Sequence, residues 1–323
     1  MKNLVVFLLT FSLSFPLLAA KYKLPKNYQK LDGCEKQKLL WNHVEKTKHD
    51  KLPGFSGMGV LKLLAMSVQA MRKKKNYDSD VAPKGWKKYL HRRGSVAKVK
   101  IVPTPGHTYT GAFQGVSCGL IRLSLTYKPT KKKRDVAPGL ALKVLRDDMP
   151  SANVSALYRL EGQEKDYNFF ANPLSNIVPI GNDIGLKLVH AIFKRVTDYP
   201  EELLVNDFAA FTSSGKKEAA PKSPRQIFFV PNPKLKMKSY KHDVREDFHK
   251  IKEGTLLYSV YAVDDKYNGF DYYNYEKKDI SKFLKDSVKV ADIITTSSFI
   301  SSEFGDTGIF FKHEMRPENK KSK

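Results

Sequence analysis

The feature that most constrains the fold of this chain is a series of short apolar segments, each about as long as a β-strand. Residues 96–102 alternate along an expected strand, and the later segments are separated by turns rich in Gly, Pro, Asp or Lys. About eight such segments suit a small closed barrel. We therefore predict an α+β protein built on an eight-stranded antiparallel β-barrel. The expected strands cover residues 96–102, 120–125, 140–145, 154–160, 226–230, 256–263, 291–297 and 309–312.

The N-terminus has the pattern of a secretory signal peptide. Lys2 gives a short positive region, residues 4–18 are apolar, and Ala19 and Ala20 form a small-residue cleavage site. A membrane anchor is the alternative, but the apolar run is short for a bilayer and contains Pro16. We expect residues 1–20 to be removed, and the mature protein to be secreted or periplasmic without a transmembrane segment.

Helical segments are expected on both sides of the first strands. Residues 61–71 carry apolar side chains at near-helical spacing, and residues 184–195 and 201–211 form a helical insertion between the fourth and fifth strands. The expected domains are a signal peptide (1–20), a helical N-terminal segment (21–85), a β-barrel domain (86–317) and a basic tail (318–323).

The charge of the chain favours anionic partners. Lys and Arg number 57 against 33 Asp and Glu, which gives a net charge of +24. Such a field attracts acidic polysaccharide, phospholipid headgroups or other polyanions. Because no basic helix with interleaved aromatic residues occurs, we expect no sequence-specific binding to nucleic acid. The Lys-rich runs at 72–75, 131–134 and 320–323 also suit a solvated surface.

Two cysteines, Cys34 and Cys118, leave two possibilities open. In an oxidising compartment they can form one disulfide across a long loop, which the chain-entropy model associates with about 4 kcal/mol of stability. The alternative is a pair of buried free thiols. No CxxC motif or Cys/His cluster with the spacing of a zinc site occurs.

Three residues are the first candidates for chemistry. His91 precedes the first expected strand, where an imidazole can act as an acid or base near neutral pH, although a structural histidine is the simpler explanation. Arg122 and Ser124 are two apart on a strand and therefore point to one face. An arginine that faces a barrel interior needs an anion beside it. That anion is a ligand carboxylate or an internal partner such as Asp135, unless the arginine side chain reaches solvent at the rim of the barrel.

The order of these residues resembles the N-terminal half of the haem catalase barrel. His91 matches the distal histidine, Arg122 the arginine that pairs with a haem propionate, and Ser124 the serine that orients the imidazole. The resemblance extends over residues 86–317 and is closest to the short catalase-like proteins. Its other matches are Arg134-Asp135, Gly139, Ala141 and Lys143, followed by the aromatic pair Phe169-Phe170.

This resemblance implies a haem-dependent catalase or peroxidase that acts on peroxides. The distal imidazole would move a proton between the peroxide oxygens, and haem would supply the redox chemistry. The chain lacks the R-x-x-x-Y-x-D-T segment that carries the proximal tyrosine in this family, so the iron ligand is not identified. The alternative is a non-catalytic binding protein of catalase fold that has lost haem and binds an anionic partner. A haem carrier or a lipid-hydroperoxide enzyme is a third possibility.

Overall fold

The computed structural model describes about a third of the chain, and the statements below concern that part. It comprises the start of the expected mature chain, the strands of one sheet and their short connections. The described residues are 23–47, 80–81, 93–106, 117–125, 138–148, 151–157, 170, 174–175, 226–235, 245–263, 284–285, 287–301, 309 and 311.

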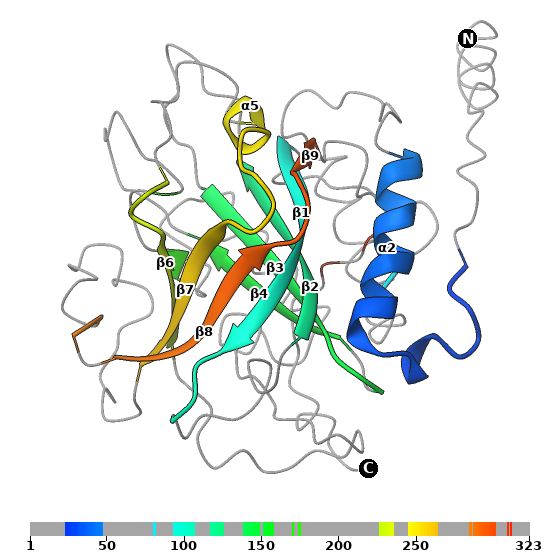
Figure 1. Cartoon of the computed structure of the whole chain (residues 1–323), viewed down its shortest axis with the longest axis horizontal. Coiled ribbons are helices and arrows are strands. Elements are labelled where there is room, and N and C mark those ends of the chain that lie inside the picture. The colour runs from blue at the N-terminus through cyan, green and yellow to red at the C-terminus, as the bar shows by residue number, and fades with distance from the viewer. Residues whose placement is uncertain are drawn as a thin grey trace, which may run out of the picture.

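One antiparallel sheet of nine strands forms the body of the described structure (Figure 1). The expected α+β class with a predominantly antiparallel sheet is therefore confirmed. Two of the strands, β5 and β9, have only two residues each and were not expected. The strands are β1 (Arg93–Pro103), β2 (Ser117–Leu125), β3 (Pro138–Leu145), β4 (Ala152–Leu157), β5 (Leu174–Ser175), β6 (Gln226–Pro231), β7 (Leu256–Val263), β8 (Ser287–Thr295) and β9 (Ile300–Ser301).

The sheet curls strongly, and β1 lies where its two ends meet. Along residues 93–101, β1 pairs with β2, and along residues 99–103 it pairs with β8 on its other side. On the opposite side of the sheet the strands are joined by few residue pairs, because β5 pairs with β4 through one residue pair and with β6 through two. The described sheet is therefore not a complete barrel, and it has nine strands rather than the eight expected.

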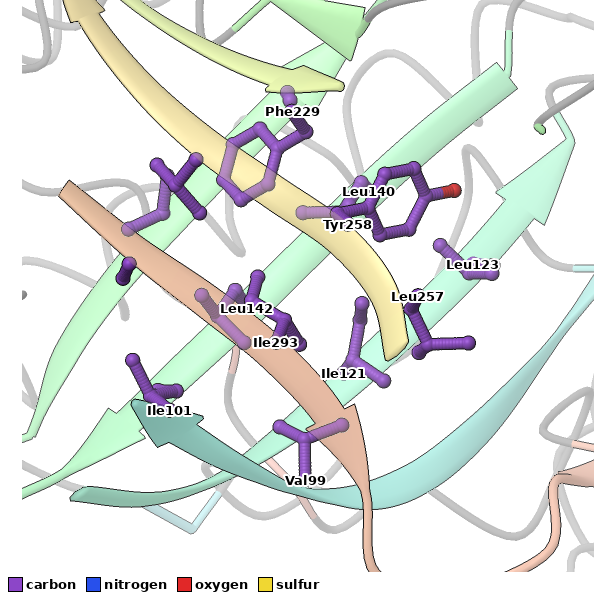
Figure 2. Packing of buried hydrophobic residues seen from close by; sticks show 14 of the residues in the cluster. Val99, Ile101, Ile121, Leu123, Leu140, Leu142, Phe229, Leu257, Tyr258 and Ile293 are labelled. Carbon is purple, nitrogen blue, oxygen red and sulfur yellow. The ribbon is translucent and has the colours of Figure 1, made fainter. Parts of the chain in front are cut away.

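The inner face of the curled sheet is filled by one apolar cluster. Alternate residues of β1, β2 and β3 point into it, because side chains on a strand alternate between the two faces. In β7 the consecutive residues Leu257 and Tyr258 both belong to the cluster, beside an irregularity in the pairing of β7 with β8. Figure 2 shows ten labelled members, which come from β1, β2, β3, β6, β7 and β8. Burying one such aliphatic or aromatic side chain contributes about 1.5–3 kcal/mol. The labelled residues are Val99, Ile101, Ile121, Leu123, Leu140, Leu142, Phe229, Leu257, Tyr258 and Ile293.

Helix α2 (Gly33–Thr47) covers part of the outer face, beside β1 and β2 (Figure 1). Its apolar side, formed by Leu40, Trp41 and Val44, packs on a second cluster that contains Val96 and Leu120. The other helices are short: the 3₁₀ turn η1 (Tyr28–Lys30) and α5 (Arg245–Phe248).

The start of α2 is held by a cap and by a close approach to β3. Asp32 accepts hydrogen bonds from the backbone N–H groups of Cys34 and Glu35, both at 2.8 Å, as an N-cap residue does. These bonds, that of Glu35 foremost, lower the pKa of Asp32 against the opposing effect of burial. The backbone of Gly33 lies so close to Leu145 that a side chain at position 33 would overlap the Leu145 carbonyl oxygen.

A disulfide between Cys34 and Cys118 ties α2 to β2. The two Cα atoms are 5.0 Å apart, and 84 residues separate the cysteines in sequence. This settles the choice between a disulfide and two free thiols.

Several expectations lie outside the described residues. They include the signal peptide at 1–20, the helical pattern at 61–71, the insertion at 184–211 and the basic tail at 318–323. The last expected strand, 309–312, is described only at residues 309 and 311, where Ile309 forms an isolated bridge to Val81. Among the described helices, none combines the length and the apolar character that crossing a bilayer requires.

Candidate functional site

Arg122 and Ser124 occupy the outer face of β2, the face that α2 covers. Ile121 and Leu123 belong to the inner apolar cluster, whereas Leu120 belongs to the cluster beneath α2. Because side chains alternate along a strand, Arg122 and Ser124 share the face of Leu120. Both are buried, with 4% of each residue exposed. The expected pairing on one face is confirmed, but that face is not the inside of the sheet.

Ser124 fits between two glycines of the neighbouring strands. In the strand register it lies opposite Gly94 of β1 and Gly139 of β3. A Cβ atom at Gly94 would lie 2.8 Å from the Ser124 Cβ, so only glycine leaves room there. The Ser124 hydroxyl donates a hydrogen bond to the Gly139 carbonyl oxygen at 3.3 Å. Its direct partner among the described residues is therefore backbone.

Phe170 lies in the inner cluster, on the opposite side of the sheet from Arg122 and Ser124. Its ring stacks on Tyr258 at a centroid distance of 5.5 Å and meets Phe248 edge-on at 6.2 Å. A haem lined by all three residues would have to contact both faces of β2 at once. The described arrangement therefore does not fit the haem site that the resemblance implies.

The other predicted site residues are not described. His91 and Phe169 lie outside the described residues, as do Arg134 and Asp135. Within the described part of the chain, no group of three or more His, Cys, Asp or Glu side chains is arranged to hold a metal ion.

A buried polar cluster that was not predicted lies on the outer face of β3 and β4. Its centre is Lys143, whose Nζ is 2.8 Å from Asp80 Oδ1 and 2.9 Å from Asn153 Oδ1. Ser151 donates its hydroxyl to Asp80, and Tyr28 donates its own to Asp80 Oδ2 at 2.8 Å. We call these five residues the Lys143 cluster.

The Lys143 cluster is closed to solvent. Lys143 is 0% exposed, Asp80 1% and Asn153 2%. The Lys143 ammonium lies 5.8 Å from the centroid of the Phe311 ring, which adds an aromatic wall. An isolated charge in such a place would be costly, whereas a paired and hydrogen-bonded one is tolerated. The sequence carried one hint, because Lys143 interrupts an otherwise apolar strand.

Lys36 of α2 extends this polar region toward the end of β3. Its Nζ donates a hydrogen bond to the Arg146 carbonyl oxygen at 2.8 Å and lies 5.8 Å from the centroid of the Tyr28 ring. Burial lowers the pKa of Lys36, and the nearby carboxylates, Asp80 first, oppose that shift. The outer face under α2 therefore contains two buried lysines, each with a defined acceptor.

Exposed lysines gather beside this covered face. Lys98 and Lys100 are two apart on β1 and point outward, opposite to the buried Val99. The Lys98 ammonium lies 5.7 Å from the centroid of the Trp41 ring on α2. Lys98 is half-buried and Lys100 is exposed.

A third exposed lysine, Lys38, lies on α2. It lies one helical turn after Cys34 and one turn before Trp41, so these three residues share one side of the helix. Cys34 is bonded to Cys118, which lies opposite Lys100 in the strand register. We call Lys38, Lys98 and Lys100 the lysine strip. It combines exposed cations with a backbone that the disulfide holds in place.

The chain matches no protein-family model and no curated protein. The resemblance to the haem catalases therefore stays a prediction from the order of its residues.

Proposed function

We propose that the protein is an exported, non-catalytic binding protein, in which a catalase-like barrel without haem presents a basic surface to an anionic polysaccharide. The barrel is part of the proposal, and the consecutive antiparallel pairing of β1 through β8 supports it. The observation that carries the loss of haem is the position of Phe170 on the inner face, away from Arg122 and Ser124.

The lysine strip supports the binding role. Lys38 and Lys100 are exposed, and the Lys98 ammonium lies 5.7 Å from the centroid of the Trp41 ring. A net charge of +24 adds a long-range field that draws polyanions toward the surface. Because the disulfide joins α2 to β2, and β2 pairs with β1, the backbone that carries the three lysines is held in place before a ligand binds. Such preorganisation lowers the entropic cost of binding.

Retention of the purified mature protein on immobilised heparin, eluted with a salt gradient, tests this proposal. The variant Lys38→Gln/Lys98→Gln/Lys100→Gln removes the strip. The matched control Lys234→Gln/Lys250→Gln/Lys252→Gln removes the same charge from three exposed lysines elsewhere. We expect the strip variant to bind roughly tenfold more weakly or worse, because each contact is worth about 1 kcal/mol in water before salt screening.

Two outcomes would contradict the binding role. Equal weakening in both variants would mean that the polyanion responds to net charge alone. Retention that does not change with salt would mean that the contact is not electrostatic.

A haem-dependent peroxidase that acts on hydrogen peroxide or an organic peroxide is the second candidate. One observation favours it: Arg122 and Ser124, the matches to the propionate-binding arginine and the orienting serine, share one buried face of β2. Oxidation of a dye by peroxide that depends on added hemin and is lost in Arg122→Ala would support this candidate over the first.

A further inference from the structure

Lys143 and Asn153 face each other across neighbouring strands. They are direct partners in the antiparallel register of β3 and β4. The amine nitrogen of Lys143 lies 2.9 Å from Asn153 Oδ1, so the amide carbon to which that oxygen is bonded lies within reach of the amine. An amine and a primary amide are thus held at the separation from which one can attack the other.

Asp80 lies against the Lys143 amine and is the acid–base that such an attack needs. Its Oδ1 contacts the Lys143 nitrogen at 2.8 Å and also accepts from Ser151, and its Oδ2 accepts from Tyr28 at 2.8 Å. The carboxyl is therefore fixed in orientation on both oxygens. A carboxyl held beside the proton that it must move is the geometric requirement for general acid–base catalysis.

Exclusion of water favours the reaction in two ways. Lys143, Asp80 and Asn153 are each no more than 2% exposed, so water does not compete with the amine for the amide carbon of Asn153. A neutral amine with a neutral carboxylic acid has the same total charge as the ammonium–carboxylate pair, and burial penalises the separated charges of that pair.

We propose that Lys143 and Asn153 become joined by an intramolecular isopeptide bond, with Asp80 as the catalytic acid–base. The Lys143 ammonium first passes a proton to Asp80. The neutral amine then attacks Asn153 Cγ, so the Nζ–Cγ bond forms and the Cγ–Nδ2 bond breaks. Asp80 gives a proton to the departing Nδ2 and takes one from Nζ. The products are a secondary amide and ammonia, and the step needs no oxidant, cofactor or metal.

This bond would lock β3 to β4 on the outer face of the sheet. The Cys34–Cys118 disulfide already locks α2 to β2, the next strand along. Together they would cross-link the helix-covered half of the sheet against unfolding and proteolysis outside the cell. The inference depends on the described fold and not on the proposed binding function.

Mass spectrometry of the purified mature protein tests the bond without any variant. Under denaturing and reducing conditions we expect an intact mass lower, by one ammonia, than the mass calculated from the sequence. Tandem spectra of a digest should then join the peptides that contain Lys143 and Asn153. An intact mass equal to the calculated one, with separate peptides, would overturn the proposal. So would the loss of one water with Lys143 joined to Asp80.

Variants assign the roles. Asp80→Asn should leave the chain without the bond and restore the missing ammonia to its mass, while Lys289→Ala, which removes a half-exposed lysine paired with Asp292, should keep the bond. Circular dichroism of each variant checks that it is folded. A folded Asp80→Asn protein that still carries the bond would remove Asp80 from the mechanism. If Asp80→Asn does not fold, the wild-type mass alone decides whether the bond exists.

Discussion

Lys143 on β3 and Asp80 form an ion pair of 2.8 Å in which neither side chain reaches solvent. Asp80 is followed by Val81, which forms a β-bridge to Ile309. The ion pair and the bridge together connect residues 80–81 to β3 and to residue 309, which are far apart in sequence. A buried pair of this kind does not show how stable a protein is, but removing one partner leaves the other uncompensated.

Lys143→Met should therefore lower the free energy of unfolding by about 3–5 kcal/mol. The change removes the cation of the unbonded pair, and with it the amine of the proposed isopeptide bond, and it leaves Asp80 buried without that partner. Urea denaturation followed by circular dichroism measures the loss.

The double variant Lys143→Met/Asp80→Leu is the matched control. It removes both charges and should recover part of the lost stability, because hydrophobic side chains can replace a buried pair at little cost. If the double variant is less stable than the single one, the charge on Asp80 is not the source of the destabilisation.

Cys34→Ser/Cys118→Ser should lower the free energy of unfolding by about 2–4 kcal/mol. The disulfide closes an 84-residue separation, and its removal restores chain entropy to the unfolded state. Denaturation of the wild type with and without a reducing agent checks this. Equal midpoints for the reduced and oxidised protein would contradict it.

Asp32→Ala should destabilise the protein by about 1 kcal/mol, because α2 loses its N-cap, whereas Asp32→Asn should retain most of the cap. The pKa of Asp32 is lowered in the folded state, so the carboxylate stabilises the protein above the pKa of the unfolded chain. That contribution is lost as the pH falls through the folded pKa. Stability of Asp32→Asn should therefore fall less steeply on acidification than that of the wild type. Parallel curves would contradict this.

Gly33→Ala should lower stability by about 1–3 kcal/mol, because the new methyl group overlaps the Leu145 carbonyl oxygen. The shift would also strain the hydrogen bond from the Gly33 N–H to Asp147, which is 2.7 Å long. The exposed helical residue Asn42 offers a control, since Asn42→Ala should change stability by less than about 0.5 kcal/mol. A neutral Gly33→Ala would show that α2 can move away from β3.

The strands were predictable where one residue pattern runs for several residues. β7 has the bounds that its apolar run indicated, 256–263, because both ends are marked by turn residues. The two-residue strands β5 and β9 carry no periodicity, so no local signal predicts them. The start of β8 at Ser287 was also missed, because residues 287–290 mix polar and apolar side chains.

The candidate site was less predictable, because it depends on which face of the sheet is turned inward and on contacts between residues that are far apart in sequence. The spacing of Arg122 and Ser124 established a shared face, but which face is inside depends on Ile121 and Leu123, which fill the core. Lys143 and Asp80 are 63 residues apart, and nothing in their local sequence pairs them. The disulfide likewise depends on the approach of α2 to β2, a long-range contact with no local sequence signal.

The separation of Phe170 from Arg122 and Ser124 supports the proposal that the protein binds no haem at these residues. Titration of the purified protein with hemin, followed by its absorption spectrum, tests this proposal. We predict no saturable, equimolar Soret band that depends on Arg122, and only weak binding that the lysine-strip variant reduces. A one-to-one Soret band that Arg122→Ala or Ser124→Ala abolishes, and that the lysine-strip variant retains, would show instead that the protein binds haem at these residues.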